Sequence, residues 1–345
     1  MILLTSDTHF TSKPRDAYRF DLFPWLHQQV KNNEVDAVII LGDLVDAKDR
    51  HTATLVNKIV GELDHLSQKT PEGVWFLMGN HDYIDPRFPF FEFLSRIPGL
   101  HYINMMITET EICDKNILFV PHTKHPEIDW DENTALLELD DIDYVFMHHT
   151  FQGAVASNGF PMEGLHTSAV FGRKKIKPLV FSGDIHVPQK IGPVEYVGCP
   201  YPINFGDDFD ARVLLIDDDD KVSELYFETI GKWKIELSEA DELHDIAGLK
   251  EGDQVKIKLI LSRSEFVEWS NHKRDITKLC EQMGLQLFGI ELEEEVSDNK
   301  DGTKGQSQVI APVSTPEESY IRFCEREGID KYTAKVGRQF VDKRR

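Results

Sequence analysis

The sequence predicts an α/β protein that continues into a smaller α+β domain. Three observations support this fold class. Apolar, strand-like runs alternate with amphipathic helical stretches over the first part of the chain. Most of these runs end in Asp, Asn or His, and after residue 208 the alternation gives way to a different pattern. A chain of 345 residues is also too long for one small core, so we expect at least two domains.

The elements of the first part follow in order. Apolar runs that end in polar residues predict five strands, over residues 1–7, 35–46, 73–82, 144–150 and 178–186. Apolar residues spaced three and four apart predict two helices, over residues 20–33 and 51–68. In open α/β sheets, ligands bind beyond the carboxyl ends of the strands, so a functional site is expected there.

The second part has a different composition and pattern. We expect a hairpin over 211–230, strands over 253–262 and 285–293, and a helix over 264–284, the α+β core running from 230 to 293. The polar, glycine-containing stretch that follows predicts a flexible linker. A tail then begins with Thr315 as a helix cap. The expected domains are 1–208, 209–293, 294–312 and 313–345.

Composition narrows the class of protein. With 41% hydrophobic residues the chain is typical of a globular protein, and no apolar run approaches the ~20 residues that cross a bilayer. The first residues form a strand-like run without the pattern of a secretory signal. The four cysteines are scattered, which argues against a disulfide framework or a structural zinc site. We therefore expect a cytoplasmic protein that does not bind membranes.

The formal net charge of -22 indicates which kinds of molecule this protein can bind. Strong acidity repels nucleic acid at long range. It also suits a metal-dependent protein, because metal ions offset clustered carboxylates, and it leaves room for a basic partner subunit.

Polar side chains that can bind metal ions gather at the predicted strand ends. The candidates are Asp7, His9, Asp43, Asp46, Asn80, His81, Asp82, His148, His149, Asp184 and His186. In an extended chain the side chains of residues i and i+2 point to the same side. Asp7 with His9, and Asp184 with His186, can therefore each bind one ion. Mixed carboxylate, amide and imidazole ligands suit manganese, iron or zinc, and a pair of such ions needs a bridging oxygen ligand, for which Asp43 is suited.

Each motif also has a plain structural explanation. A single "DxH" usually indicates a turn or a surface pair, "GD" is common after apolar strands, and "GNHD" can form a tight turn. All five occurring in this order, each after an apolar strand, favours a joint metal site.

The order DxH, GDxxD, GNHD, H and GxxH resembles that of the calcineurin-like metallophosphoesterases. More narrowly, "GDLVDAKDR", "GNHD" and "GDIHVPQ" followed by "YVGCPYPINFGD" resemble the SbcD / Mre-eleven type nuclease subunit. The resemblance covers residues 1 to about 210; the rest fits only by layout. It implies a β-sandwich flanked by helices, with a smaller α+β capping domain that binds DNA and C-terminal helices that bind an ATPase.

Roles are carried over motif by motif. One ion would be held by Asp7, His9, Asp43 and His186, and the other by Asp43, Asn80, His148 and Asp184. Asp184 stands where the family usually has histidine, and its oxygen favours Mn²⁺ or Mg²⁺ over Zn²⁺.

The remaining motif residues would act beside the ions. His81 would be the catalytic histidine that assists the leaving oxygen, with the Asp46 carboxylate orienting it. His149 would point away from His148, and Asp82 would cap or support the site.

The resemblance implies a metal-dependent DNA nuclease, a double-stranded exonuclease and single-stranded endonuclease in an SbcCD-like repair complex. DNA and an SbcC / Rad-fifty type ATPase would be its partners, and a homodimer is expected. Basic residues within 172–177 could contact DNA or form a solvated loop. The stripe of Ile329, Tyr332, Val336 and Phe340 could dock on the ATPase or pack on the chain's own domain. The alternatives are a stand-alone phosphoesterase and a non-catalytic scaffold.

Overall fold

The computed structural model describes residues 1–104, 108–129, 139–172, 176–262 and 264–294. The chain divides into two compact units, Met1–Glu295 and Val296–Arg345, and everything below concerns the first. Nearly all of the predicted linker, and the whole tail with its helical stripe, lie outside the described residues, as do residues 173–175 of the basic segment.

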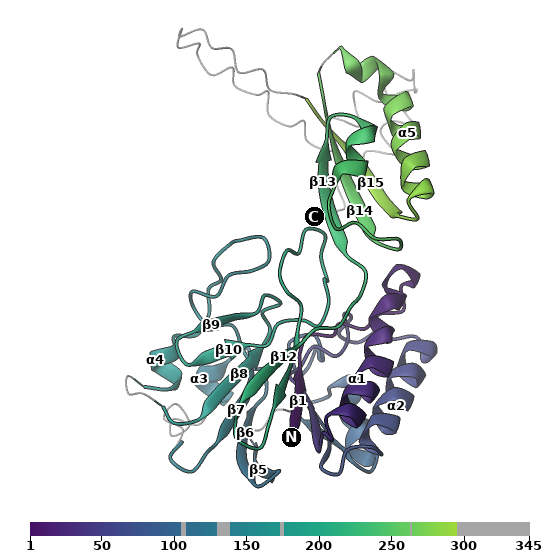
Figure 1. The fold of residues 1–345 in the computed structure, drawn as a ribbon. Helices are drawn as coiled ribbons and strands as arrows, with labels where there is room; N and C mark the ends of the chain where they lie inside the picture. Colours follow the sequence, from purple (N-terminus) through teal and green to yellow (C-terminus); the bar gives the residue numbers. More distant parts are fainter. Residues whose placement is uncertain (105–107, 130–138, 173–175, 263, 295–345) are drawn as a thin grey trace, which may run out of the picture. The chain divides into compact units, whose positions relative to one another are not determined.

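Two six-stranded sheets face each other and form a sandwich (Figure 1). The first has the order β12 (Val222–Leu225), β11 (Val213–Ile216), β1 (Ile2–Thr5), β2 (Ala37–Ile40), β3 (Gly73–Leu77) and β4 (Leu100–Ile103). The second has the order β5 (Thr108–Ile112), β6 (Lys115–Val120), β7 (Tyr144–His148), β8 (Leu179–Gly183), β10 (Val194–Tyr196) and β9 (Gln189–Ile191). The predicted α/β sandwich fold is confirmed.

The layer between the sheets is apolar because most central strands are buried along their whole length. Its core includes Leu4 and Ile39 from the first sheet, and Phe119, Phe146 and Phe181 from the second. Strands buried on both faces read as continuous apolar runs, which is why the sequence pattern was clear here.

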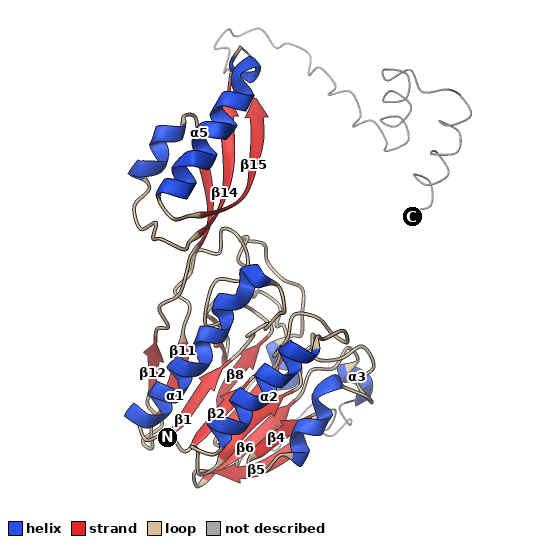
Figure 2. Ribbon diagram, turned by 90° about the vertical axis from the view of Figure 1, so that its right-hand side faces the viewer, coloured by secondary structure: helices blue, strands red, loops and turns tan. Residues whose placement is uncertain are grey.

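Helices cover the outer face of the first sheet, as Figure 2 shows. The helices of the sandwich are α1 (Leu22–Asn32), α2 (Ala53–Ser67), the one-turn α3 (Pro126–Asp129) and α4 (Thr167–Val170), and 3₁₀ helices over Pro14–Asp21 and Phe90–Arg96. Helix α2 begins at Thr52, whose side chain accepts a hydrogen bond from the Leu55 N–H at 3.2 Å. Leu26 of α1 and Ile59 of α2 belong to the core that packs beneath them.

Parallel pairing brings the candidate site together. Strands β1, β2, β3 and β4 pair in parallel, as do β6, β7, β8 and β10. Parallel neighbours end at the same edge of a sheet, so the loops that follow β1, β2, β3, β7 and β8 meet at one rim of the sandwich.

The third sheet is separate from the sandwich. It has the order β13 (Lys232–Leu237), β14 (Gln254–Leu261) and β15 (Gln286–Glu294), all parallel, and packs against α5 (Trp269–Gln282). Short 3₁₀ helices span Ala240–Asp245 and Glu265–Glu268.

The hairpin predicted over 211–230 exists as β11 and β12, but it extends the first sheet, with β11 antiparallel to β1. The buried strand β11 packs in the sandwich core, so the sandwich runs on past residue 208, and the third sheet begins only at Lys232.

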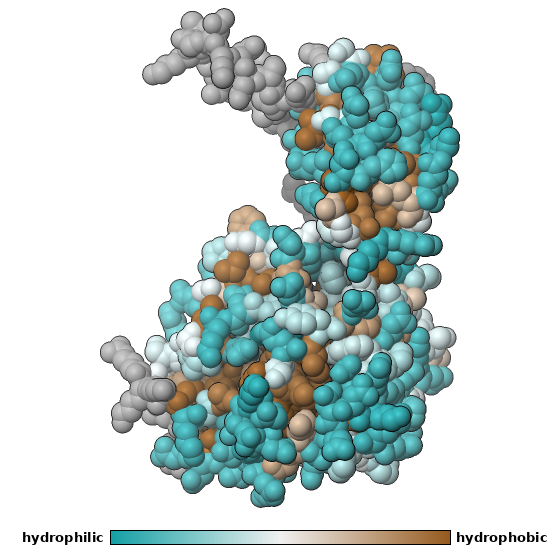
Figure 3. Space-filling model, viewed as in Figure 1, coloured by the Kyte–Doolittle hydropathy of each residue, from teal (hydrophilic) through white to brown (hydrophobic). Residues whose placement is uncertain are grey.

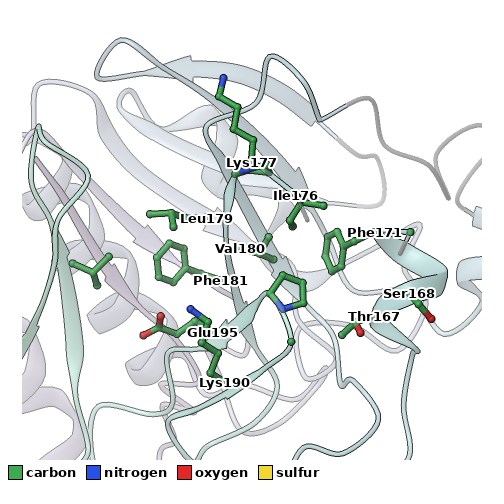
Figure 4. Close-up of a pocket in the computed structure, with 15 residues that line it drawn as sticks. Thr167, Ser168, Phe171, Ile176, Lys177, Leu179, Val180, Phe181, Lys190 and Glu195 are labelled. Atoms are coloured by element: carbon green, nitrogen blue, oxygen red, sulfur yellow. The ribbon is translucent and has the colours of Figure 1, made fainter. Parts of the chain in front are cut away.

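Apolar surface is exposed on the sandwich where Figure 1 draws β8, β10 and β12 (Figure 3). A pocket of about 640 Å³ lies there, lined by apolar side chains such as Val180 and Phe181, with Lys177, Lys190 and Glu195 among them (Figure 4). None of the predicted metal ligands lines this pocket. It lies at the N-terminal end of β8, whereas the predicted ligands follow the C-terminal end. No described helix is long and apolar enough to cross a bilayer.

Candidate metal centre

The loops at the sandwich rim are joined to one another through the backbone. The Asp7 N–H donates to the Gly42 carbonyl at 3.2 Å, and the His9 N–H donates to the Asp43 carbonyl at 2.9 Å. The Asp184 N–H donates to Asp7 Oδ1 at 3.1 Å, which ties the second sheet to the first. These bonds fix the positions of the side chains that the motifs supply.

The first group of donors surrounds His9. Its Nε2 lies 3.1 Å from Nε2 of His186 and 3.5 Å from Oδ2 of Asp43. Ligand atoms of Asp7, His9 and His186 all lie within 4.8 Å of one another. Two imidazole nitrogens that face each other beside two carboxylates are arranged to share one cation.

The second group lies on the other side of Asp43. His148 Nε2 is 3.4 Å from Asp43 Oδ1 and 3.9 Å from Asp184 Oδ1. Ligand atoms of Asp7, Asp43 and His148 lie within 4.8 Å of one another, and Asn80 Nδ2 is 2.9 Å from Asp184 Oδ1. Asp43 thus faces both groups, one with each carboxylate oxygen.

The donor atoms fit a bound cation. Within the described residues, Asn80 Oδ1 and His148 Nε2 are buried and have no hydrogen-bond partner. A buried polar atom without a partner costs about 1–3 kcal/mol, so such atoms are rare unless something absent from the protein chain satisfies them. Both orphan atoms are metal-ligand types and both point into the same cluster, which is what a divalent ion would require.

Backbone strain is concentrated at this rim. Asp7, His9, Asp43 and Asp184 have positive φ angles of 51°, 43°, 52° and 80°. Non-glycine residues rarely adopt this conformation, and each costs of order 1–3 kcal/mol outside special contexts. Four such residues meeting in one cluster indicate a geometry held for a purpose other than stability.

The electrostatics of the cluster favour a cation. Burial raises the pKa of the Asp43 carboxyl, although His148 beside it acts in the opposite direction. Burial disfavours charge on His148, yet the carboxylates of Asp43, Asp7 and Asp184 raise its pKa to about 9. Burial and the neighbouring histidines lower the pKa of His9, which keeps that ring neutral and able to act as a ligand. In the absence of metal the Asp43–His148 pair would retain a proton that a metal ion displaces.

Close backbone approach explains the glycines of the motifs. A Cβ atom added to Gly79 would collide with the backbone nitrogen and Oδ1 of Asp43. One added to Gly183 would collide with the Leu41 carbonyl and Ser6 Oγ. Only glycine leaves room for the loops to meet here.

His81 lies beside the cluster, but its orienting partner differs from the prediction. His81 Nδ1 bonds to the main-chain carbonyl of Asp46 at 2.8 Å, and the Asp46 carboxylate pairs instead with Lys13 Nζ at 3.0 Å. Because a carbonyl only accepts, Nδ1 carries the proton and Nε2 faces away from this bond. In this structure the contact with His81 Nδ1 therefore comes from the main chain of Asp46, where its carboxylate was expected.

The two neighbouring histidines separate as their alternation in a strand requires. His148 ends β7 and turns Nε2 into the cluster, while its Nδ1 bonds the Leu41 carbonyl at 2.5 Å. His149 Nε2 instead bonds the Pro121 carbonyl at 3.1 Å, and burial lowers its pKa to about 4. The geometry favours His148 as the ligand.

Several supporting residues carry no motif signal. Thr150 Oγ1 donates to Asp184 Oδ2, and the buried guanidinium of Arg19 donates to the His9 carbonyl. Thr150 lies two residues past the predicted ligand His148, so that spacing along the chain was the only hint of it. Nothing in the sequence singled out Arg19.

Residues 1–188 match the calcineurin-like phosphoesterase family. "Putative phosphoesterase 244L" of Invertebrate iridescent virus 6 is 28% identical over 232 residues, which cover 62% of this chain and 75% of that protein. The SbcD component of the nuclease SbcCD from Escherichia coli K12 is 36% identical over 89 residues, only 24% of this chain and 21% of that protein.

Among solved structures, nuclease MPE of Pseudomonas putida overlaps with a TM-score of 0.32 at 13% identity, covering 65% of this chain and 87% of that one. At that level the overlap carries no conclusion about activity. The family match spans more than half of the chain and includes every motif at the rim of the sandwich. The protein is therefore a member of the calcineurin-like phosphoesterase family, metal-dependent hydrolases that act on phosphoesters.

Proposed function

We propose that this protein is a two-metal phosphodiesterase that cleaves DNA, acting as the nuclease subunit of an SbcCD-like complex. The observation that carries the proposal is the convergence of the donor groups on Asp43. Its two carboxylate oxygens face His9 and His148 at 3.5 and 3.4 Å. A bridging carboxylate between two groups of ligands is the arrangement that recurs in two-metal phosphatases and nucleases.

The proposed ligands are Asp7, His9, Asp43 and His186 for one ion, and Asp43, Asn80, His148 and Asp184 for the other. When bound, two divalent cations supply Lewis-acid polarisation of the phosphoryl oxygens. The chain's own residues hold the ions and the substrate in place. His81, held through its Nδ1–H by the Asp46 carbonyl, would act in its doubly protonated form, giving the Nε2 proton to the leaving oxygen and keeping the Nδ1 proton.

A polynucleotide substrate is supported by a basic pocket beside the site. This pocket, of about 600 Å³, has more cations than acids in its lining. The charged and aromatic lining residues are Lys13, Arg15, Arg19, Lys232, Lys256, Asp16, Asp46, Phe205 and Phe288. Lys256 Nζ lies 4.8 Å from the centre of the Phe205 ring. Cations beside aromatic rings suit a phosphate backbone with exposed bases. In a chain of net charge -22, such clustering is notable.

The test is a Mn²⁺-dependent assay on end-labelled duplex DNA, with the wild type beside His81→Ala. We expect the wild type to shorten or nick the DNA. His81→Ala should lose at least about a hundredfold in rate while both ions still bind. Calorimetric titration with Mn²⁺ supplies the second readout. Equal loss of metal in the variant would overturn the role given to His81, and an inactive wild type that binds two ions would exclude DNA as the substrate.

Mn²⁺, with Mg²⁺ as second choice, is the proposed metal. Asp184 offers a carboxylate oxygen where the family commonly has an imidazole, and harder oxygen ligands favour these ions over Zn²⁺.

An SbcC / Rad-fifty type ATPase is the proposed partner, and the protein is proposed to be a homodimer. The 36% identity with a stretch of the Escherichia coli SbcD component supports the partner, although it covers only about a fifth of that protein. Deleting residues 313–345 should abolish co-purification with the ATPase and leave nuclease activity intact. Unchanged association would refute docking through the tail.

A stand-alone phosphoesterase is the second candidate. It is favoured by the longer match to the viral phosphoesterase, which covers 75% of that protein. Cleavage of bis-p-nitrophenyl phosphate, but not of duplex or single-stranded DNA with or without the ATPase, would select it.

A further inference from the structure

We propose that His27, Glu62 and His65 form a separate binding site for one transition-metal ion, with Zn²⁺ as the best fit, between helices α1 and α2. These three residues belong to none of the motifs at the rim of the sandwich. Helices α1 and α2 lie side by side on the outer face of the first sheet (Figure 2), whereas the catalytic ligands follow the carboxyl ends of the strands.

Helix geometry brings the three side chains together. Glu62 and His65 are three residues apart on α2, so they lie on the same face of that helix. His27 faces them from α1, and its Nε2 lies 3.4 Å from Glu62 Oε2. The ring centres of His27 and His65 are 4.4 Å apart. One ligand atom from each residue lies within 4.8 Å of the other two, a spacing that small side-chain movements reduce to coordination distance.

The protonation state of His27 suits a ligand. Only 12% of its side chain is exposed, and its Nδ1 is buried without a hydrogen-bond partner among the described residues. Burial, and then the positive charge of Lys69, lower the pKa of His27, while Glu62 acts in the opposite direction. The ring is therefore neutral near pH 7, with a lone pair available on one nitrogen.

Two imidazoles and one carboxylate are a Zn²⁺ donor set, and three protein ligands leave a fourth position for water. The same set binds Cu²⁺ and Ni²⁺, but oxygen-preferring Mg²⁺ is disfavoured by the two nitrogens. This distinguishes it from the rim site, where carboxylate and amide oxygens are more numerous. A plain His–Glu hydrogen bond between two helices explains the 3.4 Å contact, but it does not explain a second imidazole held against the first.

An ion bound here would clamp α1 to α2. Their packing forms the outer layer over β1, β2 and β3, so the clamp would stiffen the layer behind the catalytic rim without touching any catalytic ligand. The inference does not depend on the proposed nuclease activity.

The test counts Zn²⁺ bound to the full chain. Wild type, His65→Gln and His27→Gln are loaded with Zn²⁺, passed over a desalting column and measured by elemental analysis. His65 is exposed, so its replacement leaves the fold intact. His101→Gln is the matched control, because His101 is a half-buried histidine on β4 that stacks on Trp75 at 4.0 Å.

We expect the wild type and His101→Gln to hold one more Zn²⁺ per chain than His65→Gln. Competition with a chromophoric chelator should show at least tenfold weaker binding at this site in both site variants. Zn²⁺ should raise the unfolding temperature of the wild type more than that of His65→Gln, in samples whose unfolding temperatures without Zn²⁺ are equal. Equal Zn²⁺ counts in wild type and His65→Gln would overturn the inference, as would one ion shared between two chains.

Discussion

The carboxylate of Asp82 holds the backbone of Asp43 in place. Asp82 Oδ2 accepts the N–H of Asp43 at 2.9 Å and that of Gly79 at 2.7 Å, while its Oδ1 accepts the N–H of Leu44 at 3.0 Å. Asp43 has a positive φ of 52°, a conformation that needs support. The fully buried side chain of Asp82 thus fixes the loop that carries Asp43, the proposed bridging carboxylate.

Replacing Asp82 with Asn should therefore destabilise the protein. The amide group would turn a donor toward N–H groups that need an acceptor, and each hydrogen bond to a charged group contributes roughly 1.5–3 kcal/mol. We expect the free energy of unfolding to fall by about 3 kcal/mol and Mn²⁺ affinity to fall with it. Urea unfolding and calorimetry measure these quantities. Asp85→Asn is the control, because Asp85 is partly exposed and its carboxylate bonds Arg87; equal losses in both variants would contradict this account.

Replacing Asp184 with His should change the metal preference. The variant exchanges a carboxylate oxygen for an imidazole nitrogen and gives up the hydrogen bonds with Asn80 and Thr150. Zn²⁺ affinity should rise relative to Mn²⁺ by at least about tenfold, because nitrogen ligands suit Zn²⁺ better. Competitive metal titration measures the ratio. Asp184→Asn keeps an oxygen ligand and should retain the wild-type order, so a similar shift in that variant would contradict the explanation.

Replacing Asp46 with Asn tests the main-chain orientation of His81. The Asp46 carboxylate pairs with Lys13, and the carbonyl that holds His81 remains in the variant. The rate of phosphodiester cleavage should stay within about tenfold of the wild type, whereas general acid–base groups typically contribute roughly 10²–10⁴-fold. Single-turnover kinetics on a phosphodiester measure this rate. A loss of rate in Asp46→Asn as large as that in His81→Ala would show that the Asp46 carboxylate orients His81.

Two glycine-to-alanine variants should have different effects: Gly79→Ala should weaken metal binding, and Gly61→Ala should stabilise the fold. Gly79→Ala forces a methyl group against Asp43, so Mn²⁺ affinity should fall at least tenfold. Gly61 lies inside α2, where an added Cβ meets nothing within 4 Å. Gly61→Ala should raise the free energy of unfolding by about 0.5–1 kcal/mol, because alanine favours helix. Thermal unfolding and metal titration of both variants check this, and a stabilised Gly79→Ala with full affinity would contradict it.

We expect the stability difference between the wild type and a variant at Asp220 to depend on pH. It lies in the turn between β11 and β12, where it accepts hydrogen bonds from Lys115 Nζ at 2.6 Å and from the Tyr144 hydroxyl. Hydrogen bonding by Lys115, then by Tyr144, lowers the pKa of this carboxyl. The stabilisation is therefore present above the unfolded pKa of about 3.9 and is lost as the pH falls through the lower, folded value.

Asp220→Asn keeps a residue that tolerates the positive φ of 64° and removes the charge. Because the side chain is 48% exposed, the wild type should be more stable at pH 7 by less than ~1 kcal/mol. Urea unfolding at pH 7 and at pH 3.5 should show this advantage shrinking at the lower pH. An advantage that stays constant or grows at pH 3.5 would contradict the prediction.

The strands that deliver the site were predictable because they are buried on both faces. Runs such as 37–40 and 144–148 are apolar at almost every position, and their ends coincide with polar motifs. Parallel pairing then made the meeting of Asp7, Asp43 and His148 a consequence of topology. This is why a set of residues spread over most of the sandwich could be grouped from the sequence.

Other features depend on contacts that no local pattern records. The hairpin β11–β12 was predictable, but its place beside β1 was not, because antiparallel pairing between distant strands leaves no mark on either one. The main-chain carbonyl of Asp46 contacts His81 where the carboxylate was expected to do so. This contact could not be predicted, because backbone groups are the same at every residue. His27 and His65 lie far apart in sequence, and only the packing of two helices makes them neighbours.

The strand β1 lies between β2 and β11, with Ile2 paired to Ala37 on one side and to Ile216 on the other. During synthesis the ribosome delivers β1 first, and its second neighbour, β11, only after all the loops of the candidate metal centre have been translated. Until then one backbone edge of this four-residue strand is unpaired and open to any other extended chain. A nascent or truncated polypeptide that stops before β11 therefore presents the unpaired edge of a buried strand, which can pair with other extended chains and lead to aggregation.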